Sequence, residues 1–153
     1  MLKTLNKAII LSTSLAFALT SFATSKDYQV ALKQEGQVAA KVVTVEKVRI
    51  ANQNLKVHDN VAVTALISNN SDQSHEIISA YSPVAEIIQL HKTDGAIMKQ
   101  LNNITLAPHE TLALNQNKDH IMLINLKKDL TNKEPVPLFI EFKDGSWLKT
   151  IIT

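Results

Sequence analysis

The feature that most constrains the fold is a series of short segments rich in β-branched residues, each closed by turn-forming residues. Residues 42–50 and 61–68 are two such segments, and the second ends at the turn formers 69–72. No long amphipathic helical pattern interrupts the series. Short strands at such spacing predict an antiparallel β-sandwich. The remaining expected strands are residues 76–81, 84–91, 96–101, 104–106, 111–114, 120–126, 136–142 and 147–152.

Two of the expected turns contain an Asp-Gly pair between apolar segments, which is a strong hairpin signal. These pairs are Asp94-Gly95 and Asp144-Gly145. We therefore expect one hairpin around each of them. The pattern of residues 126–133 fits a helical turn and a loop equally well, so both alternatives stay open.

The N-terminus has the three parts of a secretory signal peptide. Two lysines precede an apolar run from Ala8 to Phe22, and small residues stand at Ser21 and Ala23. The alternative is a retained membrane anchor, but the run contains several Ser and Thr residues and is shorter than about 20 strongly apolar residues. We expect cleavage after Ala23. The expected organisation is a signal peptide at 1–23, a flexible arm at 24–40 and a folded domain at 41–153.

Charge and cysteine content exclude several classes of function. The chain has 16 Lys+Arg and 14 Asp+Glu, and cleavage would remove Lys3 and Lys7 with no acid, which leaves 14 of each. A neutral chain without a basic cluster is not expected to bind nucleic acid or a membrane surface. There is no cysteine, so disulfides and metal sites that need a thiolate are excluded.

One group of residues suggests metal chemistry. His120 and Met122 are two residues apart, so in a strand they point to the same face. His91 and Met98 flank the Asp94-Gly95 turn, so a hairpin brings them together. Thioethers are soft, neutral ligands that favour copper(I) over zinc, magnesium or calcium. A lone methionine is more often core filler, and His91 could simply end a strand at the surface.

The spacing of these residues resembles a known signature. Met98, 21 intervening residues and then His120-x-Met122 is similar to the motif of the periplasmic copper chaperones called PCu(A)C. The resemblance covers about residues 42–153. It includes the segments 82–91, 111–114, 120–126 and 136–142.

The resemblance implies a cupredoxin-like antiparallel Greek-key β-sandwich in a periplasmic, monomeric copper(I) chaperone that is not an enzyme. It further implies delivery of copper to a copper-accepting protein, such as the cytochrome c oxidase subunit with the binuclear copper centre or another copper chaperone. The hairpin is shorter than the family's, with six residues between the first His and the Met. The copper(I) ligands implied by the resemblance are His91, Met98, His120 and Met122.

Two alternatives remain open at this point. A metal-free envelope module with an Ig-like sandwich, serving interaction or assembly, would keep His91 and Met98 far from His120 and Met122. Copper storage would use the same site chemistry as delivery. The chain contains no Gly-x-Ser-x-Gly elbow and no Gly-rich phosphate loop, so no catalytic arrangement stands out.

For the other polar and aromatic residues we expect ordinary structural roles. The carboxylate of Asp119 could orient the neighbouring imidazole or be solvated, and solvation is the simpler interpretation. Trp147 is expected to pack the last strand against the core. The histidines in turn-like, polar surroundings are expected on the surface; they are His58, His75 and His109.

Overall fold

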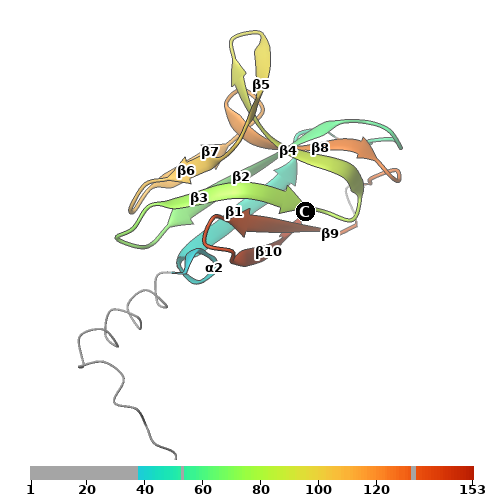
Figure 1. The fold of residues 1–153 in the computed structure, drawn as a ribbon. Helices are drawn as coiled ribbons and strands as arrows, with labels where there is room; N and C mark the ends of the chain where they lie inside the picture. Colours follow the sequence, from blue (N-terminus) through green and yellow to red (C-terminus); the bar gives the residue numbers. More distant parts are fainter. Residues whose placement is uncertain (1–37, 53, 132–133) are drawn as a thin grey trace, which may run out of the picture.

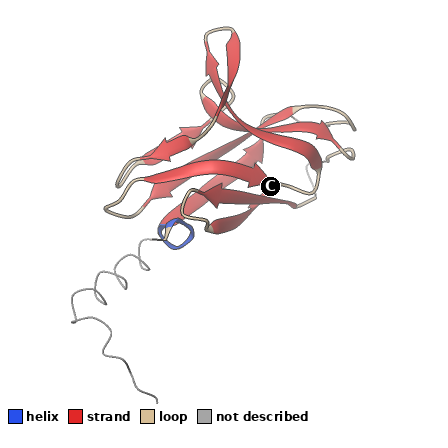
Figure 2. Cartoon of the chain, in the orientation of Figure 1, coloured by secondary structure: helices blue, strands red, loops and turns tan. Residues whose placement is uncertain are grey.

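The computed structural model describes residues 38–153 except 53 and 132–133. The expected signal peptide and residues 24–37 of the expected arm lie outside the described residues. The described chain is almost entirely β-strand, with one short helix at its start (Figures 1 and 2). The elements are α2 (Ala39–Val42), β1 (Val43–Ile50), β2 (Val61–Asn69), β3 (His75–Tyr81), β4 (Ala85–Asp94), β5 (Ile97–Leu101), β6 (Ile104–Leu106), β7 (Thr111–Leu114), β8 (Asp119–Leu126), β9 (Val136–Phe142) and β10 (Trp147–Ile152).

These strands form two antiparallel sheets. The first has the order β1-β2-β8-β4-β5, and β7 also pairs with β2. The second has the order β10-β9-β3-β6. The antiparallel β-sandwich expected from the strand pattern is therefore confirmed. Both Asp-Gly hairpins form as expected, one between β4 and β5 and the other between β9 and β10.

The core lies between the two sheets and is built by alternation along the strands. On β2, every second residue from Val61 to Ile67 is buried, and β9 alternates in the same way from Val136 to Phe142. Each buried aliphatic or aromatic side chain stabilises the fold by about 1.5–3 kcal/mol relative to exposure. The largest fully buried apolar side chains are Ile67, Ile77, Leu106, Ile121, Leu123, Leu126, Leu138, Ile140, Phe142 and Ile152.

The short helix α2 is fastened to the β9–β10 turn. The backbone N–H of Ala39 donates to Oδ2 of Asp144 at 2.8 Å, and that of Ala40 donates to Oγ of Ser146 at 3.1 Å. Burial alone would raise the pKa of Asp144, but the hydrogen bonds from Ser146 and Ala39 hold this pKa below its usual value. Ala39 itself is fully buried. The described structure therefore begins inside the segment expected as an arm.

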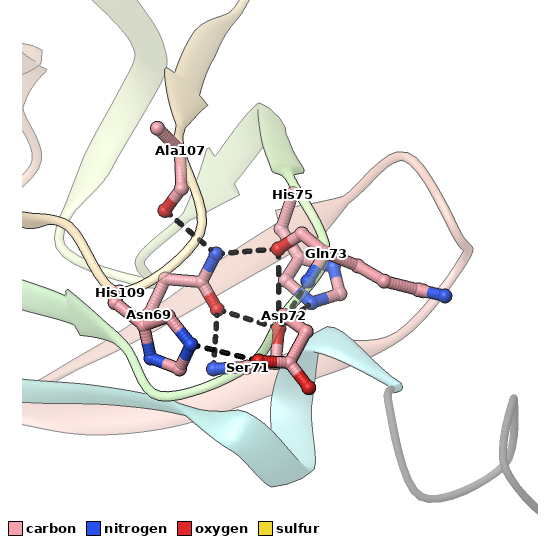
Figure 3. A network of polar contacts seen from close by, with 7 residues as sticks. All are labelled: Asn69, Ser71, Asp72, Gln73, His75, Ala107 and His109. Carbon is pink, nitrogen blue, oxygen red and sulfur yellow. Dashed lines mark hydrogen bonds and ion pairs between the residues drawn. The ribbon is translucent and has the colours of Figure 1, made fainter.

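A buried polar network closes the turn between β2 and β3 (Figure 3). The Nδ2 group of Asn69 donates to the carbonyls of Gln73 at 2.7 Å and Ala107 at 2.9 Å. Its Oδ1 accepts the hydroxyl of Ser71 at 2.8 Å, and that hydroxyl lies 3.0 Å from Nε2 of His75. His75 is only 8% exposed. The expectation that it lies on the surface was wrong, because its ring fills a place in this network.

The other surface expectations had mixed outcomes. His58 and His109 are exposed, as expected. The expectation for Trp147 was wrong: it is 47% exposed. Alternation along β10 turns Leu148 and Ile152 inward and leaves Trp147 on the outer side of the sheet. The described part of residues 126–133 contains no helix, and Leu130 forms an isolated bridge with Leu55.

None of the helices in the described ranges has the length and apolar character needed to cross a bilayer.

Candidate metal centre

The β4–β5 hairpin projects from the body of the sandwich (Figure 1). Its strands are joined by a two-residue turn, in which Gly95 has a φ of +62°. Glycine adopts this left-handed conformation without the steric cost that a side chain would bring. In the hairpin register, His91 pairs with Gln100 and Thr93 pairs with Met98. The turn therefore places Met98 two residue pairs beyond the His91–Gln100 pair, toward the tip of the hairpin.

The opposite edge of β4 pairs with β8 and brings the two predicted histidine ligands together. His91 lies directly opposite His120 in this register. Their ring centroids are 5.7 Å apart, and the ring planes meet at 73° in an edge-to-face arrangement. The metal-free interpretation expected the two histidines to lie far apart, and this contact does not agree with it.

The two thioethers lie on the same face of the sheet as the imidazoles. Directly paired residues share a face of a sheet, and so do residues two apart along a strand. Met122 pairs with Gln89, two residues before His91, and Met98 pairs with Thr93, two residues after it. Each methionine is thus a diagonal cross-strand neighbour of His91, a position that long side chains can span. Met98 is 48% exposed, whereas Met122 is partly buried.

Each imidazole of the pair has one buried ring nitrogen without a hydrogen-bond partner. His120 is fully buried; its Nδ1 lies 2.9 Å from the carbonyl of Lys118, and its Nε2 has no partner. His91 has its Nε2 2.8 Å from Oε1 of Gln89, and its buried Nδ1 has no partner. Leaving a buried polar atom unpaired costs about 1–3 kcal/mol. Such atoms are uncommon in folded proteins and call for an explanation such as an ion.

The electrostatics of the pair keep His91 available as a ligand. Burial lowers its pKa below the ordinary value of 6.5, and the nearby His120 lowers it further. A neutral imidazole has a free lone pair, whereas a protonated one cannot bind a metal. At neutral pH the ring of His91 is therefore ready to bind a cation.

A clasp joins the projecting hairpin to the turn before β8. The carbonyl of Lys118 accepts the backbone N–H of Thr93 at 3.1 Å as well as the ring of His120. The Thr93 hydroxyl donates to the carbonyl of Gln116 at 2.7 Å. The Lys118 carbonyl thus bonds both to the backbone of the hairpin and to the buried imidazole of His120.

The hydrogen-bond partners of the two imidazoles differ from what the sequence indicated or lie beyond it. The partner of the His120 ring is the Lys118 carbonyl, and no hydrogen bond joins the ring to the carboxylate of Asp119. The partner of the His91 ring is Gln89. The period of two along a strand could have indicated Gln89, because it places residues 89 and 91 on one face. A backbone carbonyl leaves no such signal in a sequence.

Carboxylates do not complete the site. Within 38–153, leaving aside 53 and 132–133, no group of three or more His, Cys, Asp or Glu side chains could hold a metal ion. The predicted sulfur ligands, the thioethers of Met98 and Met122, lie on the same face of the sheet as the two imidazoles.

Comparison with solved structures defines the class of this sandwich, which is the cupredoxin-like fold of PCuAC domains. The copper-bound PCuAC domain from PmoF2 superposes with a TM-score of 0.63 at 16% identity, over 76% of this chain and 94% of that one. The solution structure of CuI-DR1885 from Deinococcus radiodurans gives a TM-score of 0.60 at 26% identity, over 78% and 84% of the two chains. The apo PCuAC domain from PmoF1 gives 0.60 at 17% identity, over 73% and 92%.

The chain belongs to the LpqE-like family. The model of that family, described as "Putative lipoprotein LpqE-like", matches residues 43–151. A search of the curated proteins gave no match. The resemblance to PCu(A)C proteins that the spacing of the His and Met residues indicated is confirmed.

Proposed function

We propose that this protein is a copper(I) carrier of the cell envelope. It binds one cuprous ion through His91, Met98, His120 and Met122 and passes the ion to a copper-accepting protein. The observation that supports this most directly is the pair of neighbouring imidazoles, each with a buried ring nitrogen that lacks a partner. A cation between the rings would satisfy both nitrogens at once.

The donor set favours copper(I) over other ions. Thioethers are soft ligands that bind copper(I) well, whereas magnesium and calcium prefer oxygen and zinc prefers thiolate or imidazole. Imidazole and thioether are both neutral, so the bound ion keeps its single positive charge. The site contains no thiol that an oxidising compartment would convert to a disulfide.

The location of the site suits transfer better than permanent binding. Met98 is half exposed on a projecting hairpin, whereas His120 is fully buried. A partner's ligand could displace the outer thioether first, while the inner imidazole still holds the ion. The proposal is accordingly a carrier that is neither an enzyme nor an electron-transfer protein.

The wider role follows from the family resemblance. Copper-bound PCuAC domains are among the structural neighbours. We propose that residues 1–23 direct the chain to the periplasm and are removed, and that the mature chain acts as a monomer. The acceptor is a copper-binding protein, with the binuclear copper centre of cytochrome c oxidase as the first candidate.

Replacing the two thioethers tests the proposal. In the double variant Met98→Leu/Met122→Leu, the apolar volume is nearly preserved but both sulfur ligands are lost. Copper(I) affinity, measured anaerobically by competition with a calibrated chelator, should fall about 100-fold or more, equivalent to about 2.8 kcal/mol. Circular dichroism should show an unchanged fold.

The matched control is the double variant Ile97→Leu/Ile124→Leu, which changes one apolar residue within two positions of each methionine on the same strands. Its copper affinity should stay within a few-fold of the wild-type value. Equal copper affinity in the methionine variant, the control and the wild type would refute the proposed ligand set.

A further inference from the structure

The two neighbouring imidazoles differ in which ring nitrogen has no hydrogen-bond partner. The unpartnered atom is Nδ1 in His91 but Nε2 in His120. The other nitrogen of each ring is held from outside the pair, by Gln89 in the first case and by the Lys118 carbonyl in the second. The hydrogen bonds around the site therefore determine which nitrogen of each ring is free.

The protonation of His120 follows directly from its partner. A backbone carbonyl can only accept a hydrogen bond, so Nδ1 of His120 carries the proton in the neutral ring and donates to Lys118. Its buried Nε2, which has no hydrogen-bond partner, then keeps a free lone pair.

The protonation of the His91 ring depends instead on the side-chain amide of Gln89. With the amide oxygen of Gln89 facing the ring, Nε2 donates the hydrogen bond and Nδ1 keeps its lone pair. With the amide nitrogen facing the ring, Nδ1 would carry a buried proton that has no acceptor and could not bind a metal. Only the arrangement in the structure leaves a free lone pair on each ring.

We infer that Gln89 is a positioning residue for copper(I) binding: it fixes the tautomer of His91 so that the metal is bound through Nδ1, while His120 binds through Nε2. This inference rests on the proposed function. Hydrogen bonds of this kind orient a ligand ring and raise its basicity, and their loss typically lowers metal affinity about 10–100-fold. Because the glutamine is neutral, it orients the ring without adding charge to the site.

Nitrogen NMR of the imidazoles tests the inference. In the metal-free protein labelled with ¹⁵N-histidine, at a pH where the rings are neutral, two-bond correlations should identify the Nε2–H tautomer for His91 and the Nδ1–H tautomer for His120. Addition of copper(I) under anaerobic conditions should shift the resonance of Nδ1 in His91 and of Nε2 in His120.

Three variants separate positioning from packing. Gln89→Leu removes the acceptor, so His91 should show a mixture of tautomers and copper(I) affinity should fall about tenfold or more. Gln89→Glu keeps an acceptor oxygen and should retain the Nε2–H tautomer. Gln100→Leu is the matched control, because Gln100 pairs with His91 from the other strand without a hydrogen bond to its ring; both tautomer and affinity should stay unchanged.

The outcomes distinguish this inference from the function on which it rests. The positioning role would be overturned if copper(I) bound tightly but shifted the resonance of Nε2 in His91. It would also be overturned if Gln89→Leu and Gln100→Leu had the same His91 tautomer and the same copper(I) affinity. Either result would leave the carrier function intact. A protein that shows both expected tautomers but does not respond to copper(I) would overturn the carrier function, and the role of Gln89 in metal binding with it.

Discussion

His120 is fully buried, and its two ring nitrogens have different surroundings. Nδ1 donates to the Lys118 carbonyl, while Nε2 is buried without a partner. In the metal-free protein, the hydrogen bond contributes about 0.5–1.5 kcal/mol and the unpaired nitrogen costs about 1–3 kcal/mol. At this residue the cost of the unpaired nitrogen is comparable to or larger than the contribution of the hydrogen bond, so the two polar terms together add no stability to the metal-free fold.

Replacement of this histidine should therefore affect binding far more than folding. We expect His120→Leu to change the free energy of unfolding of the metal-free protein by no more than about 1 kcal/mol, because the hydrogen bond and the unpaired nitrogen are lost together. Copper(I) binding should be abolished. Urea unfolding and chelator competition measure the two effects.

His75→Leu provides the comparison, since His75 is also buried but its hydrogen bond to Ser71 is part of a satisfied network. That variant should lose about 1–3 kcal/mol of stability and keep its copper affinity. An equally large loss of stability in His120→Leu would indicate that the histidine serves the fold rather than a ligand.

The lowered pKa of His91 gives the pH dependence of binding a definite sign. Burial and the neighbouring His120 hold this pKa below 6.5, so the metal-free ring stays neutral to a lower pH than an ordinary histidine. Protons should compete with copper(I) for this ligand only below about pH 6.5. Copper(I) affinity should be nearly constant from pH 8 to that point and fall on further acidification. Affinity that is unchanged down to pH 4 would contradict ligation by the imidazole.

At the scale of elements, the β4–β5 hairpin and the turn before β8 act together. The hairpin carries His91 and Met98, and β8 carries His120 and Met122. The bonds from Thr93 to the Gln116 and Lys118 carbonyls fasten one element to the other. The distance between the outer thioether and the buried ring is therefore set partly by this clasp.

Removal of one bond of the clasp should loosen the site. Thr93→Val keeps the shape of the side chain but loses the hydroxyl that donates to Gln116, at a cost of about 0.5–1.5 kcal/mol in stability. Because the hairpin is then less constrained, copper(I) affinity should fall several-fold. Thr105→Val, on the exposed side of β6, is the control and should leave copper affinity unchanged. Equal affinities in the two variants would rule out a role for the clasp.

Strand positions were largely predictable because β-branched segments and turn formers are local signals. Residues 111–114, 136–142 and 147–152 were predicted with the bounds that the structure has, and the Asp-Gly pairs located both hairpins. The placement of β7 beside β2 had no such signal, because long-range pairing depends on the packing of the whole sandwich.

Side-chain environments were less predictable than strands. His75 stands in a polar turn, so its sequence context did not reveal a buried network that includes Asn69 and Ser71. The apolar character of Trp147 suggested burial, but alternation along β10 decides which residues face the core. The four proposed copper ligands could be selected from residue type and spacing. The contact between the two imidazoles required the register of β4 against β8.

At the scale of the whole molecule, the sandwich separates a rigid support from an accessible site. The core between the sheets and the network around Asn69 contain satisfied hydrogen bonds and buried apolar side chains. His91 and His120 alternate with the core residues Leu90 and Ile121, so they lie on the face of the first sheet that points away from the core. The hairpin that carries His91 projects from the sandwich (Figure 1). A carrier needs this combination, because the ligands must keep their positions while the ion enters and leaves.

Anaerobic titration of the purified protein with cuprous ion tests the central claim most directly, with metal analysis for stoichiometry and X-ray absorption for the ligand atoms. We predict one copper(I) per chain, bound by both nitrogen and sulfur. Protein that retains no cuprous ion, or that holds it through nitrogen and oxygen alone, would contradict the account.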